Sequence, residues 1–250
     1  MTGSTEPVLV LLHGGGPGVD AASNWASVLP RFEKEFRCIA PDLLGFGTRI
    51  GDGGDLHGPI AWARARARQV HELLDDLGLA RVHLLGNSAA GGAAGLALLA
   101  TAPERVERAV VMGGAGTGPA PRTVPFYDVP TKASMRDTLA RLVADEGDHT
   151  ELLDDLADLR WEQALRPGAE KAFRSMFETS DEPPVDPATV PTPVLALHGE
   201  RDRVGPVEVS ARLAAALPCG SLGVVAGAGH WIHVDRPDEF CTRVGEFLTA

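Results

Sequence analysis

The sequence predicts an α/β fold in which a mostly parallel sheet of about six strands has helices packed on both faces. Two observations predict this class. Short continuous apolar runs, such as residues 8–12 and 194–198, are typical of strands buried on both faces of a sheet. Longer segments with helical periodicity alternate with these runs along most of the 250 residues. Such alternation is typical of parallel sheets, because a helix must carry the chain back to the start of the next strand.

The predicted elements follow in chain order. Strands are expected at residues 8–12, 37–40, 82–85, 109–112, 194–198 and 222–225. Helices are expected at 25–36, 61–77, 88–100 and 237–248. The candidate catalytic residues fall just after the ends of several strands, which is where open α/β sheets bind their ligands.

One long stretch interrupts this alternation. After residue 118 no convincing strand appears before 194, and the stretch contains three helical patterns, at 131–146, 149–165 and 169–177. Proline-rich segments, 119–130 and 183–193, flank it. We therefore expect a core built from residues 1–117 and 191–250, with a helical cap at 118–190 inserted between two core strands.

The composition narrows the class of partners. The formal net charge is −11 and the pI about 5.1. Nucleic acid and anionic membranes attract basic proteins, so both are disfavoured. The cysteines (Cys38, Cys219 and Cys241) are odd in number and irregularly spaced, which indicates reduced thiols and no metal site. The first seven residues carry no signal-peptide pattern, and no apolar run reaches the roughly 18 residues of a spanning helix. We expect a cytoplasmic protein acting on a small molecule.

The most informative motif is the turn Gly-Asn-Ser-Ala-Ala-Gly-Gly at residues 86–92, which follows an apolar strand and precedes a small-residue helix. A nucleophile elbow needs this strand–turn–helix context, and Ser88 stands at its nucleophile position. Two other interpretations exist: a helix N-cap serine, and a glycine-rich turn of a Rossmann-like protein. Ala90 replaces the elbow's second glycine, and we expect mild strain there.

A serine nucleophile requires a base and an orienting acid. His230 is the candidate base, since it lies in a glycine-containing loop between the last strand and the last helix. His233 is its nearest competitor and is expected to pack or cap the following turn. Asp202 is the candidate acid, in the loop after the strand at 194–198. The preceding strand ends in Gly-Gly-Ala-Gly, and no carboxylate follows it before Asp128. The order Ser, Asp, His is that of α/β-hydrolases.

Two backbone N–H groups complete the predicted catalytic set. An oxyanion hole needs donors aimed at the developing negative charge. Gly15 and Ala89 are the candidates, because one lies in the glycine run after the first strand and the other directly follows Ser88. Glycine at positions 14–16 lets the backbone approach the oxyanion without an intervening Cβ.

Arg160 is the candidate for substrate recognition. It shares a helical face with Leu153, Leu156 and Ala164, and an arginine on an otherwise apolar face needs a partner. A substrate carboxylate held bidentately would serve. The residues alone leave two alternatives open, namely a structural carboxylate such as Asp154 or Asp158, and solvent.

Several segments together carry a resemblance to a known family. They are residues 13–18 (HGGGPG), 23–25 (SNW), 41–47 (PDLLGFG), 86–88 (GNS), 160–162 (RWE), 199–203 (GERDR) and 229–231 (GHW). The chain resembles the α/β-hydrolase fold and, within it, the meta-cleavage-product hydrolases, which cut carbon–carbon bonds in ring-fission products. The elbow and the first loop are common to many members of the fold, whereas Asn24, Arg160 and Trp231 are more particular to this family.

The resemblance implies a serine-dependent hydrolase that cleaves a carbon–carbon bond in a substrate of the 2-hydroxy-6-oxo-dienoate kind. It implies a pocket lined by Asn24, Arg160 and Trp231, to which we add Gly14 and Asn87, and it implies no metal and no organic cofactor. For Asn24 and Trp231 the residues alone allow a structural role. The usual preceding strand pair is lacking before residue 8, so we expect an exposed sheet edge that is covered or used in a homo-oligomer.

Two other functions stay open on the sequence. An ordinary carboxylesterase or lactonase would use the same triad, would give Arg160 no substrate role and would turn over simple esters well. A non-hydrolytic lyase, cyclase or ligand-binding protein on the same scaffold is the second alternative. For the hydrolase itself, the sequence does not decide between attack by Ser88 and attack by a water molecule activated through His230.

Overall fold

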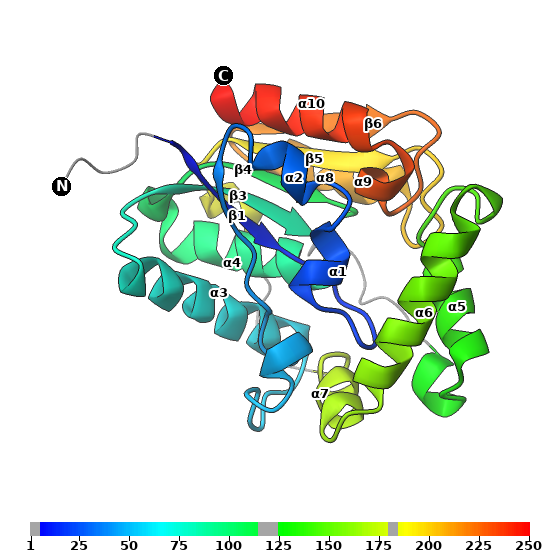
Figure 1. Ribbon diagram of the computed structural model, residues 1–250. Coiled ribbons are helices and arrows are strands. Elements are labelled where there is room, and N and C mark those ends of the chain that lie inside the picture. Colours follow the sequence, from blue (N-terminus) through cyan, green and yellow to red (C-terminus); the bar gives the residue numbers. More distant parts are fainter. Residues whose placement is uncertain (1–5, 115–124, 180–184) are drawn as a thin grey trace.

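The computed structural model describes residues 6–114, 125–179 and 185–250, which form a six-stranded sheet between two layers of helices (Figure 1). The strand order is β2-β1-β3-β4-β5-β6, and each neighbouring pair is parallel. The α/β fold predicted from the sequence is confirmed. Because all the strands run the same way, their carboxyl ends meet at one edge, where the loops that follow them converge.

The strands are β1 (Val8–Leu12), β2 (Arg37–Ile39), β3 (Val82–Asn87), β4 (Val106–Met112), β5 (Val194–Gly199) and β6 (Gly220–Val225). Their predicted positions are confirmed, but β3, β4 and β6 are each two or three residues longer than predicted. The pairing of β3 with β4 continues through Gly86 and Asn87, which lie opposite Val111 and Met112. The ladder therefore extends to the residue directly before Ser88 and fixes the start of the turn.

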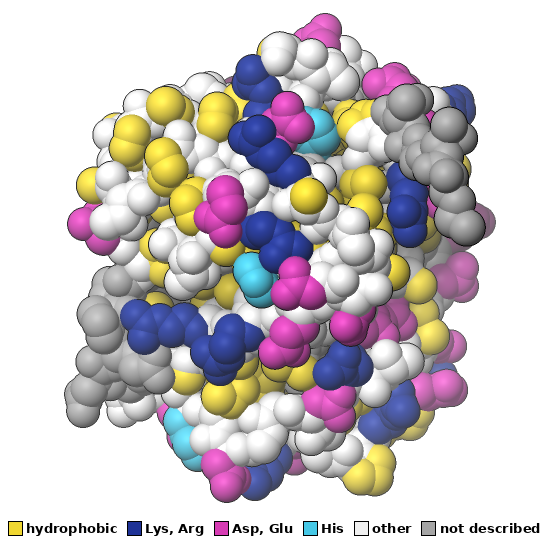
Figure 2. Space-filling view, turned by 90° about the vertical axis from the view of Figure 1, so that its left-hand side faces the viewer, with side chains coloured by type: hydrophobic (Ala, Val, Ile, Leu, Met, Phe, Trp, Pro, Cys, Tyr) yellow, Lys and Arg dark blue, Asp and Glu magenta, His cyan; other side chains and the backbone are white. Residues whose placement is uncertain are grey.

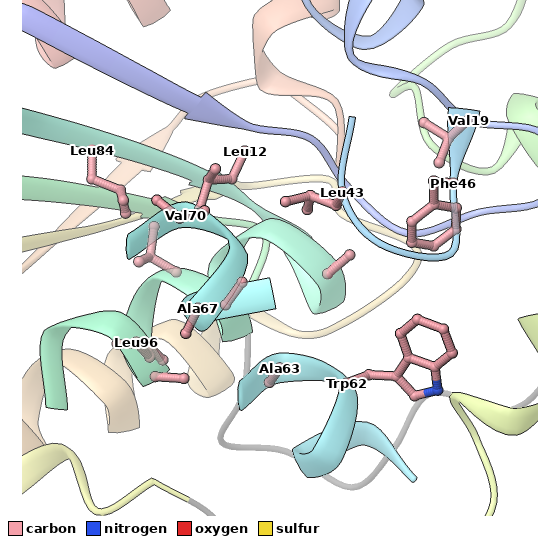
Figure 3. Packing of buried hydrophobic residues seen from close by; sticks show 14 of the residues in the cluster. Leu12, Val19, Leu43, Phe46, Trp62, Ala63, Ala67, Val70, Leu84 and Leu96 are labelled. Carbon is pink, nitrogen blue, oxygen red and sulfur yellow. The ribbon is translucent and has the colours of Figure 1, made fainter. Parts of the chain in front are cut away.

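Three helices cover one face of the sheet: α3 (Pro59–Asp76), α4 (Ala93–Thr101) and α8 (Val207–Ala216). Figure 3 shows Val70 of α3 near Leu12 of β1 and Leu84 of β3, with Ala67 and Ala63 on the turns of the same helix before it. The helix α8 has no counterpart among the predicted elements. Its first residues, Val-Glu-Val-Ser, alternate apolar and polar side chains, which is a strand-like pattern.

The other face is covered by α1 (Ala21–Trp25), α2 (Leu29–Phe32), α9 (Ile232–Asp235) and α10 (Pro237–Thr249). The prediction of one helix over residues 25–36 is wrong, because the chain turns between α1 and α2. Pro30 stands in the first turn of α2. Proline has no backbone N–H and is tolerated only where a helix begins, so a new helix starts there. The predicted last helix is confirmed as α10.

Between β4 and β5 the chain forms α5 (Lys132–Ala140), α6 (Thr150–Ala164) and α7 (Ala169–Ser175). We call residues 125–179 the helical insertion. It stands beside the end of the sheet toward which the arrowheads of β1 and β3 point (Figure 1). All three predicted helices are found, although α5 ends at Ala140, before the predicted 146. The predicted start of the cap at residue 118 and parts of both proline-rich flanks (119–124 and 183–184) lie outside the described residues, and the division into core and cap stays a prediction.

The face of the molecule away from the helical insertion is shown in Figure 2, where basic and acidic side chains are interspersed. Some of the charged side chains at the surface of the molecule form ion pairs, such as Arg105 with Asp75 at 2.8 Å. Such pairs contribute little to stability and do not form a site. The three cysteines are free. Among the described residues, no helix has both the length and the apolar character needed to cross a membrane.

Candidate active site

Ser88 stands on a tight turn between β3 and α4. Its φ is +54°, the one positive φ of a non-glycine residue in the described part of the chain. Strain of this kind is concentrated at functional sites. Residues 88–92 form a single π-helical turn. A Cβ at Gly91 would lie 2.0 Å from the carbonyl oxygen of Leu12, so glycine is required there. Ala90 has no positive φ: Ser88 carries the left-handed φ, and the position that allows no Cβ is one later, at Gly91.

The structure brings Ser88, His230 and Asp202 into one hydrogen-bonded chain. The distance from Ser88 Oγ to His230 Nε2 is 2.8 Å, and that from His230 Nδ1 to Asp202 Oδ2 is 2.7 Å. The other oxygen of Asp202 accepts the backbone N–H groups of Val204 and Gly205, at 2.7 and 3.0 Å. Burial disfavours the charged carboxylate, but the His230 and backbone hydrogen bonds outweigh it and lower the pKa of Asp202. The acid is thus held as a carboxylate.

Close backbone packing places the loops of this chain. A Cβ at Gly113, where β4 ends, would lie 2.7 Å from Cε1 of His230, so only glycine leaves room for the imidazole. A Cβ at Gly199 would lie 2.0 Å from the carbonyl oxygen of Gly229. The loop that carries Asp202 therefore lies directly against the loop that carries His230.

His198, at the end of β5, is a contributor that sequence reasoning missed. Its Nε2 is 3.1 Å from the carbonyl oxygen of Gly205 and 3.3 Å from Oδ2 of Asp202, and its Nδ1 is 2.7 Å from Oγ of Ser210. The carbonyl can only accept, so Nε2–H donates and Nδ1 accepts the Ser210 hydroxyl. His198 supports Asp202 together with His230. A histidine inside an apolar strand pattern gave no signal of this.

His233 is buried against aromatic rings, with its centroid 5.3 Å from that of Trp25 and 5.9 Å from that of Phe240. Burial lowers its pKa to about 3, which keeps the imidazole neutral. The prediction that His233 packs is confirmed.

The glycine loop after β1 is anchored by His13. Nδ1 of His13 lies 2.8 Å from the carbonyl oxygen of Gly14, and Nε2 accepts the N–H of Leu43 at 2.9 Å. Burial lowers the pKa of His13 to about 4, so it is neutral near pH 7. A Cβ at Gly15 would lie 3.8 Å from the backbone nitrogen of Ala90. Gly15 therefore lies beside the turn that contains Ala89, as an oxyanion hole formed by the two residues requires.

Two buried amides lie next to this loop. Oδ1 of Asn24 accepts from the N–H of Gly14 at 3.2 Å and from Nδ2 of Asn87 at 3.1 Å. Nδ2 of Asn24 and Oδ1 of Asn87 are buried without a hydrogen-bond partner. Leaving a buried polar group unsatisfied typically costs about 1–3 kcal/mol. Such groups are typical of a site that a ligand completes.

Arg160 projects from α6 and is 3% exposed. Its Nε and Nη2 atoms are buried with no hydrogen-bond partner, and its Cζ lies 5.0 Å from the ring centroid of Trp231. A Cβ at Gly16 would lie 3.7 Å from Nη1 of Arg160, so the cation faces the glycine loop. Burial lowers its pKa to about 10. Trp231 directly follows His230, and this stacking brings the cation close to the hydrogen-bonded chain.

The structural partners considered for Arg160 are engaged elsewhere. Asp154 pairs with Arg136 at 2.7 Å, and Asp158 pairs with Lys132 at 2.9 Å. Solvent does not reach Nε and Nη2 of Arg160, because both atoms are buried. Asp20 favours the charge of Arg160 electrostatically, but its Oδ2 accepts from the amide of Gln163, at 2.6 Å. A buried cation without a hydrogen-bonded anion is costly, and an anionic ligand would supply one.

The three successive glycines of the β1 loop connect these parts: Gly14 donates to the amide of Asn24, Gly15 lies beside the elbow, and Gly16 faces Arg160. All the predicted site residues therefore gather at the carboxyl end of the sheet, between the core and the helical insertion. Within the described residues there is no cluster of three or more His, Cys, Asp or Glu side chains that could hold a metal. The arrangement combines the hydrogen-bonded chain of Ser88, His230 and Asp202 with a buried cation and two amides that have unpartnered polar atoms.

The chain is similar to a family of known proteins and to several of its members. Residues 9–243 match the model of the alpha/beta hydrolase family. The chain is 36% identical to a 2-hydroxy-6-oxo-2,4-heptadienoate hydrolase of Pseudomonas putida, over 99% of this chain and 91% of the relative. It is 34% identical to a 2-hydroxymuconate semialdehyde hydrolase of Pseudomonas sp. strain CF600, over 96% of this chain and 86% of the relative. Among solved structures, 2-hydroxy-6-oxo-6-phenylhexa-2,4-dienoate hydrolase from Rhodococcus sp. strain RHA1 is similar, with a TM-score of 0.85, 32% identity, and coverage of 98% of this chain and 91% of that one.

Proposed function

The chain belongs to the alpha/beta hydrolase family, and from this premise we propose that it hydrolyses a carbon–carbon bond in a 2-hydroxy-6-oxo-dienoate. Such a substrate carries a carboxylate at one end and a ketone at the other. The relatives named above act, by their names, on compounds of this class. Ser88, His230 and Asp202 are the proposed triad.

The buried cation of Arg160 is the observation that carries the choice of substrate. Its Nε and Nη2 have no partner, and both neighbouring carboxylates considered from the sequence are paired elsewhere. A guanidinium binds a carboxylate through two parallel hydrogen bonds, and exclusion of water strengthens the interaction. A substrate carboxylate at this position would compensate the charge, whereas a neutral ester would leave it uncompensated.

The reaction divides between the two ends of the substrate. With the carboxylate on Arg160, the dienol ketonises, so that the breaking carbon–carbon bond can leave its electron pair on a stabilised dienolate. The C6 ketone is then attacked by Ser88, or by water activated through His230, and the N–H groups of Gly15 and Ala89 hold the oxyanion. One water molecule is consumed, and the products are a carboxylic acid and a shorter 2-hydroxydienoate.

The unsatisfied amide groups fit the same proposal. Nδ2 of Asn24 can donate and Oδ1 of Asn87 can accept. A substrate with a hydroxyl and two carbonyl oxygens offers partners for both kinds of group. We therefore assign Asn24, Asn87 and Gly14 to the substrate pocket, with Trp231 beside Arg160.

The test compares two substrates on the wild-type enzyme. For carbon–carbon cleavage, kcat/KM is measured from the loss of visible absorbance of 2-hydroxy-6-oxohepta-2,4-dienoate and of bulkier dienoates. For ester cleavage, kcat/KM is measured from the release of p-nitrophenol from a neutral ester. We expect the dienoates to be the better substrates. Efficient ester turnover with no turnover of any dienoate would instead make the enzyme a carboxylesterase or lactonase.

A further inference from the structure

The loops of the proposed acid and base are both bound to one short segment of the helical insertion, residues 140–144, which begins at the last residue of α5. Arg203, the residue after Asp202, donates from Nη2 to two carbonyl oxygens of this segment, at 2.7 and 3.0 Å. The N–H of Trp231, the residue after His230, donates to a third, at 2.7 Å. The 140–144 segment thus holds both loops.

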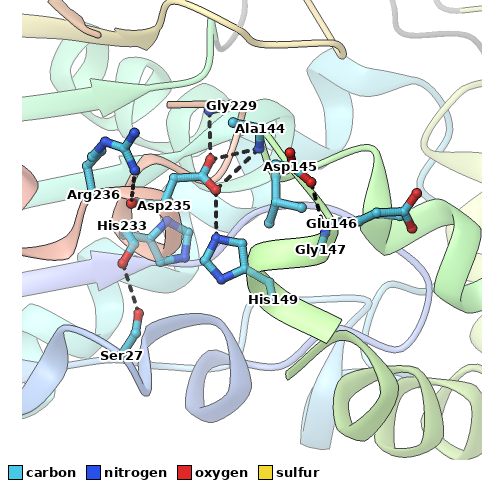
Figure 4. Close-up of polar contacts among 12 residues, drawn as sticks. Ser27, Ala144, Asp145, Glu146, Gly147, His149, Gly229, His233, Asp235 and Arg236 are labelled. Carbon is cyan, nitrogen blue, oxygen red and sulfur yellow. Dashed lines mark hydrogen bonds and ion pairs between the residues drawn. The ribbon is translucent and has the colours of Figure 1, made fainter. Parts of the chain in front are cut away.

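Asp235 makes the most buried of these connections, with a side chain 2% exposed. Figure 4 shows its carboxylate between the insertion and the His230 loop. It accepts the N–H of Ala144 at 3.0 and 3.2 Å and the N–H of Gly229 at 2.7 Å. Nε2 of His149, at the start of α6, lies 2.9 Å from Oδ1. One carboxylate therefore joins two positions of the insertion to the residue directly before His230.

The two backbones are in close contact at this point. A Cβ at Gly229 would lie 2.6 Å from the nitrogen of Ala144 and 2.7 Å from the carbonyl carbon of Val143. The N–H groups of Gly229 and Ala144 both point to the carboxylate of Asp235. Without that acceptor, two buried donors would face each other unsatisfied, and the backbones would be expected to separate.

We propose that Asp235 is a positioning residue: by joining the 140–144 segment to the His230 loop, it sets the distance between His230 and Ser88. The helical insertion then cannot separate from the His230 loop without also displacing His230 from Ser88, because the carboxylate of Asp235 holds both contacts. The inference rests on the nucleophile and base roles assigned under the proposed function, and not on the identity of the substrate.

The experiment measures His230-assisted reactivity of Ser88 directly. Phenylmethanesulfonyl fluoride reacts when the serine oxygen attacks sulfur, fluoride leaves, and the serine proton passes to the histidine. Its second-order rate constant is measured on folded enzyme well below Tm, with mass spectrometry to locate the adduct. For Asp235→Ala we expect a fall of about 100-fold, since a displacement of about 1 Å of a catalytic group has that order of effect.

Two matched variants separate positioning from general stability. Asp235→Asn keeps one oxygen for both backbone N–H groups, while its NH₂ can donate to His149 after a change of tautomer, so the rate should stay within about threefold of wild type. Thr131→Ala removes the capping box of α5, at the other end of the same helix. It should lower Tm and leave the rate constant within about threefold, because it loosens the insertion without touching Asp235.

The outcomes are decisive in either direction. A wild-type rate in folded Asp235→Ala, or an equal fall in Thr131→Ala, overturns the proposal. If Asp235→Ala does not fold, Gly229→Ala replaces it: all hydrogen-bonding groups remain, but the added Cβ forces the 140–144 segment from the His230 loop, and an unchanged rate again overturns the proposal. Equal labelling of Ser88→Ala and wild type would count against the nucleophile itself, which keeps the two failures apart.

Discussion

The two sides of the site differ in how completely their polar groups are satisfied. On the core side, Ser88, His230 and Asp202 are joined by hydrogen bonds of 2.7 and 2.8 Å. On the binding side, Asn24, Asn87 and Arg160 each bury at least one polar atom that has no partner. Both sets lie at the carboxyl end of the sheet. They adjoin in the chain at Asn87 and Ser88, and Trp231, which contacts Arg160, directly follows His230.

This difference indicates which side is complete before the substrate arrives. The chain of Ser88, His230 and Asp202 is already hydrogen-bonded, so in the proposed reaction little reorganisation is needed. The binding side has a cost of roughly 1–3 kcal/mol for each unsatisfied group, more for the cation, and a substrate with complementary charge recovers it. The predictions below separate the two sides, in order of decreasing effect.

The largest effect is expected at the nucleophile. Ser88→Ala should lower kcat by several powers of ten, on the order of 10⁶ for a residue that acts as part of a triad. Folding should be unaffected, because Ser88 is only partly buried and alanine removes a single oxygen. Turnover is measured alongside circular dichroism. Near-normal rates in correctly folded protein would rule out the triad assignment.

The next effect tests the acid. Asp202→Asn should lower kcat by up to about 10⁴-fold, because the amide favours the wrong tautomer of His230. Asp235→Asn is the control: that carboxylate is also buried near His230 but contacts the backbone of its loop and not its ring. Kinetics of the two variants on one substrate decide the assignment. Loss of activity in Asp235→Asn alone would mean that the acid was chosen wrongly.

The third prediction concerns the binding side. Arg160→Met should lower kcat/KM for a dienoate about 10- to 150-fold and leave a neutral ester unchanged, because only the dienoate carries the carboxylate. The same substitution should raise the free energy of unfolding by about 1–3 kcal/mol, since it removes a buried charge that has no hydrogen-bonded anion, and methionine can keep the apolar contact with Trp231. Function and stability should therefore change in opposite directions.

Arg66→Met is the matched control for Arg160. Arg66 is equally buried at 3%, but it donates to the carbonyl oxygen of Leu44 and lies 4.8 and 4.9 Å from the ring centroids of Phe46 and Trp62. Its loss should lower the free energy of unfolding by about 1–3 kcal/mol without substrate selectivity. If both variants lose stability equally, the cation of Arg160 is structural, and the esterase interpretation moves ahead.

Sequence reasoning located the core side well because its signals are local. Ser88, Asp202 and His230 each follow an apolar strand within a few residues, and parallel strands bring such positions to one edge. The glycines of the elbow likewise predicted that backbones pack closely there. The position that allows no Cβ is Gly91, one residue after the position expected from the motif.

What the sequence could not supply depends on contacts between distant segments. Asp235 is one of 34 acidic residues in the sequence. Its proposed positioning role depends on the N–H group of Ala144, 91 positions away in the chain. The ring of His198 lies between Asp202, 3.3 Å from Nε2, and Ser210 of α8, 2.7 Å from Nδ1, and only the folded chain brings these three side chains together. For Arg160, helical spacing allowed Asp154 and Asp158 as partners, and only the side-chain packing of α5 against α6 excluded them.

The smallest effect is the pH dependence of stability, which should arise on the core side. Burial lowers the pKa of His13 from 6.5 to about 4, so the folded protein binds fewer protons than the unfolded chain between these values. Stability is then fully present above pH 6.5 and is lost as the pH falls toward 4. Between pH 7 and pH 5 the loss from His13 should be about 2 kcal/mol. Arg160, with a pKa of about 10, keeps its charge throughout and contributes no such change.

Urea unfolding of wild type and His13→Asn at both pH values isolates the contribution of His13, since His233 contributes equally to both proteins. An identical pH dependence in the two would mean that His13 does not enter the folded state as the neutral anchor of the glycine loop.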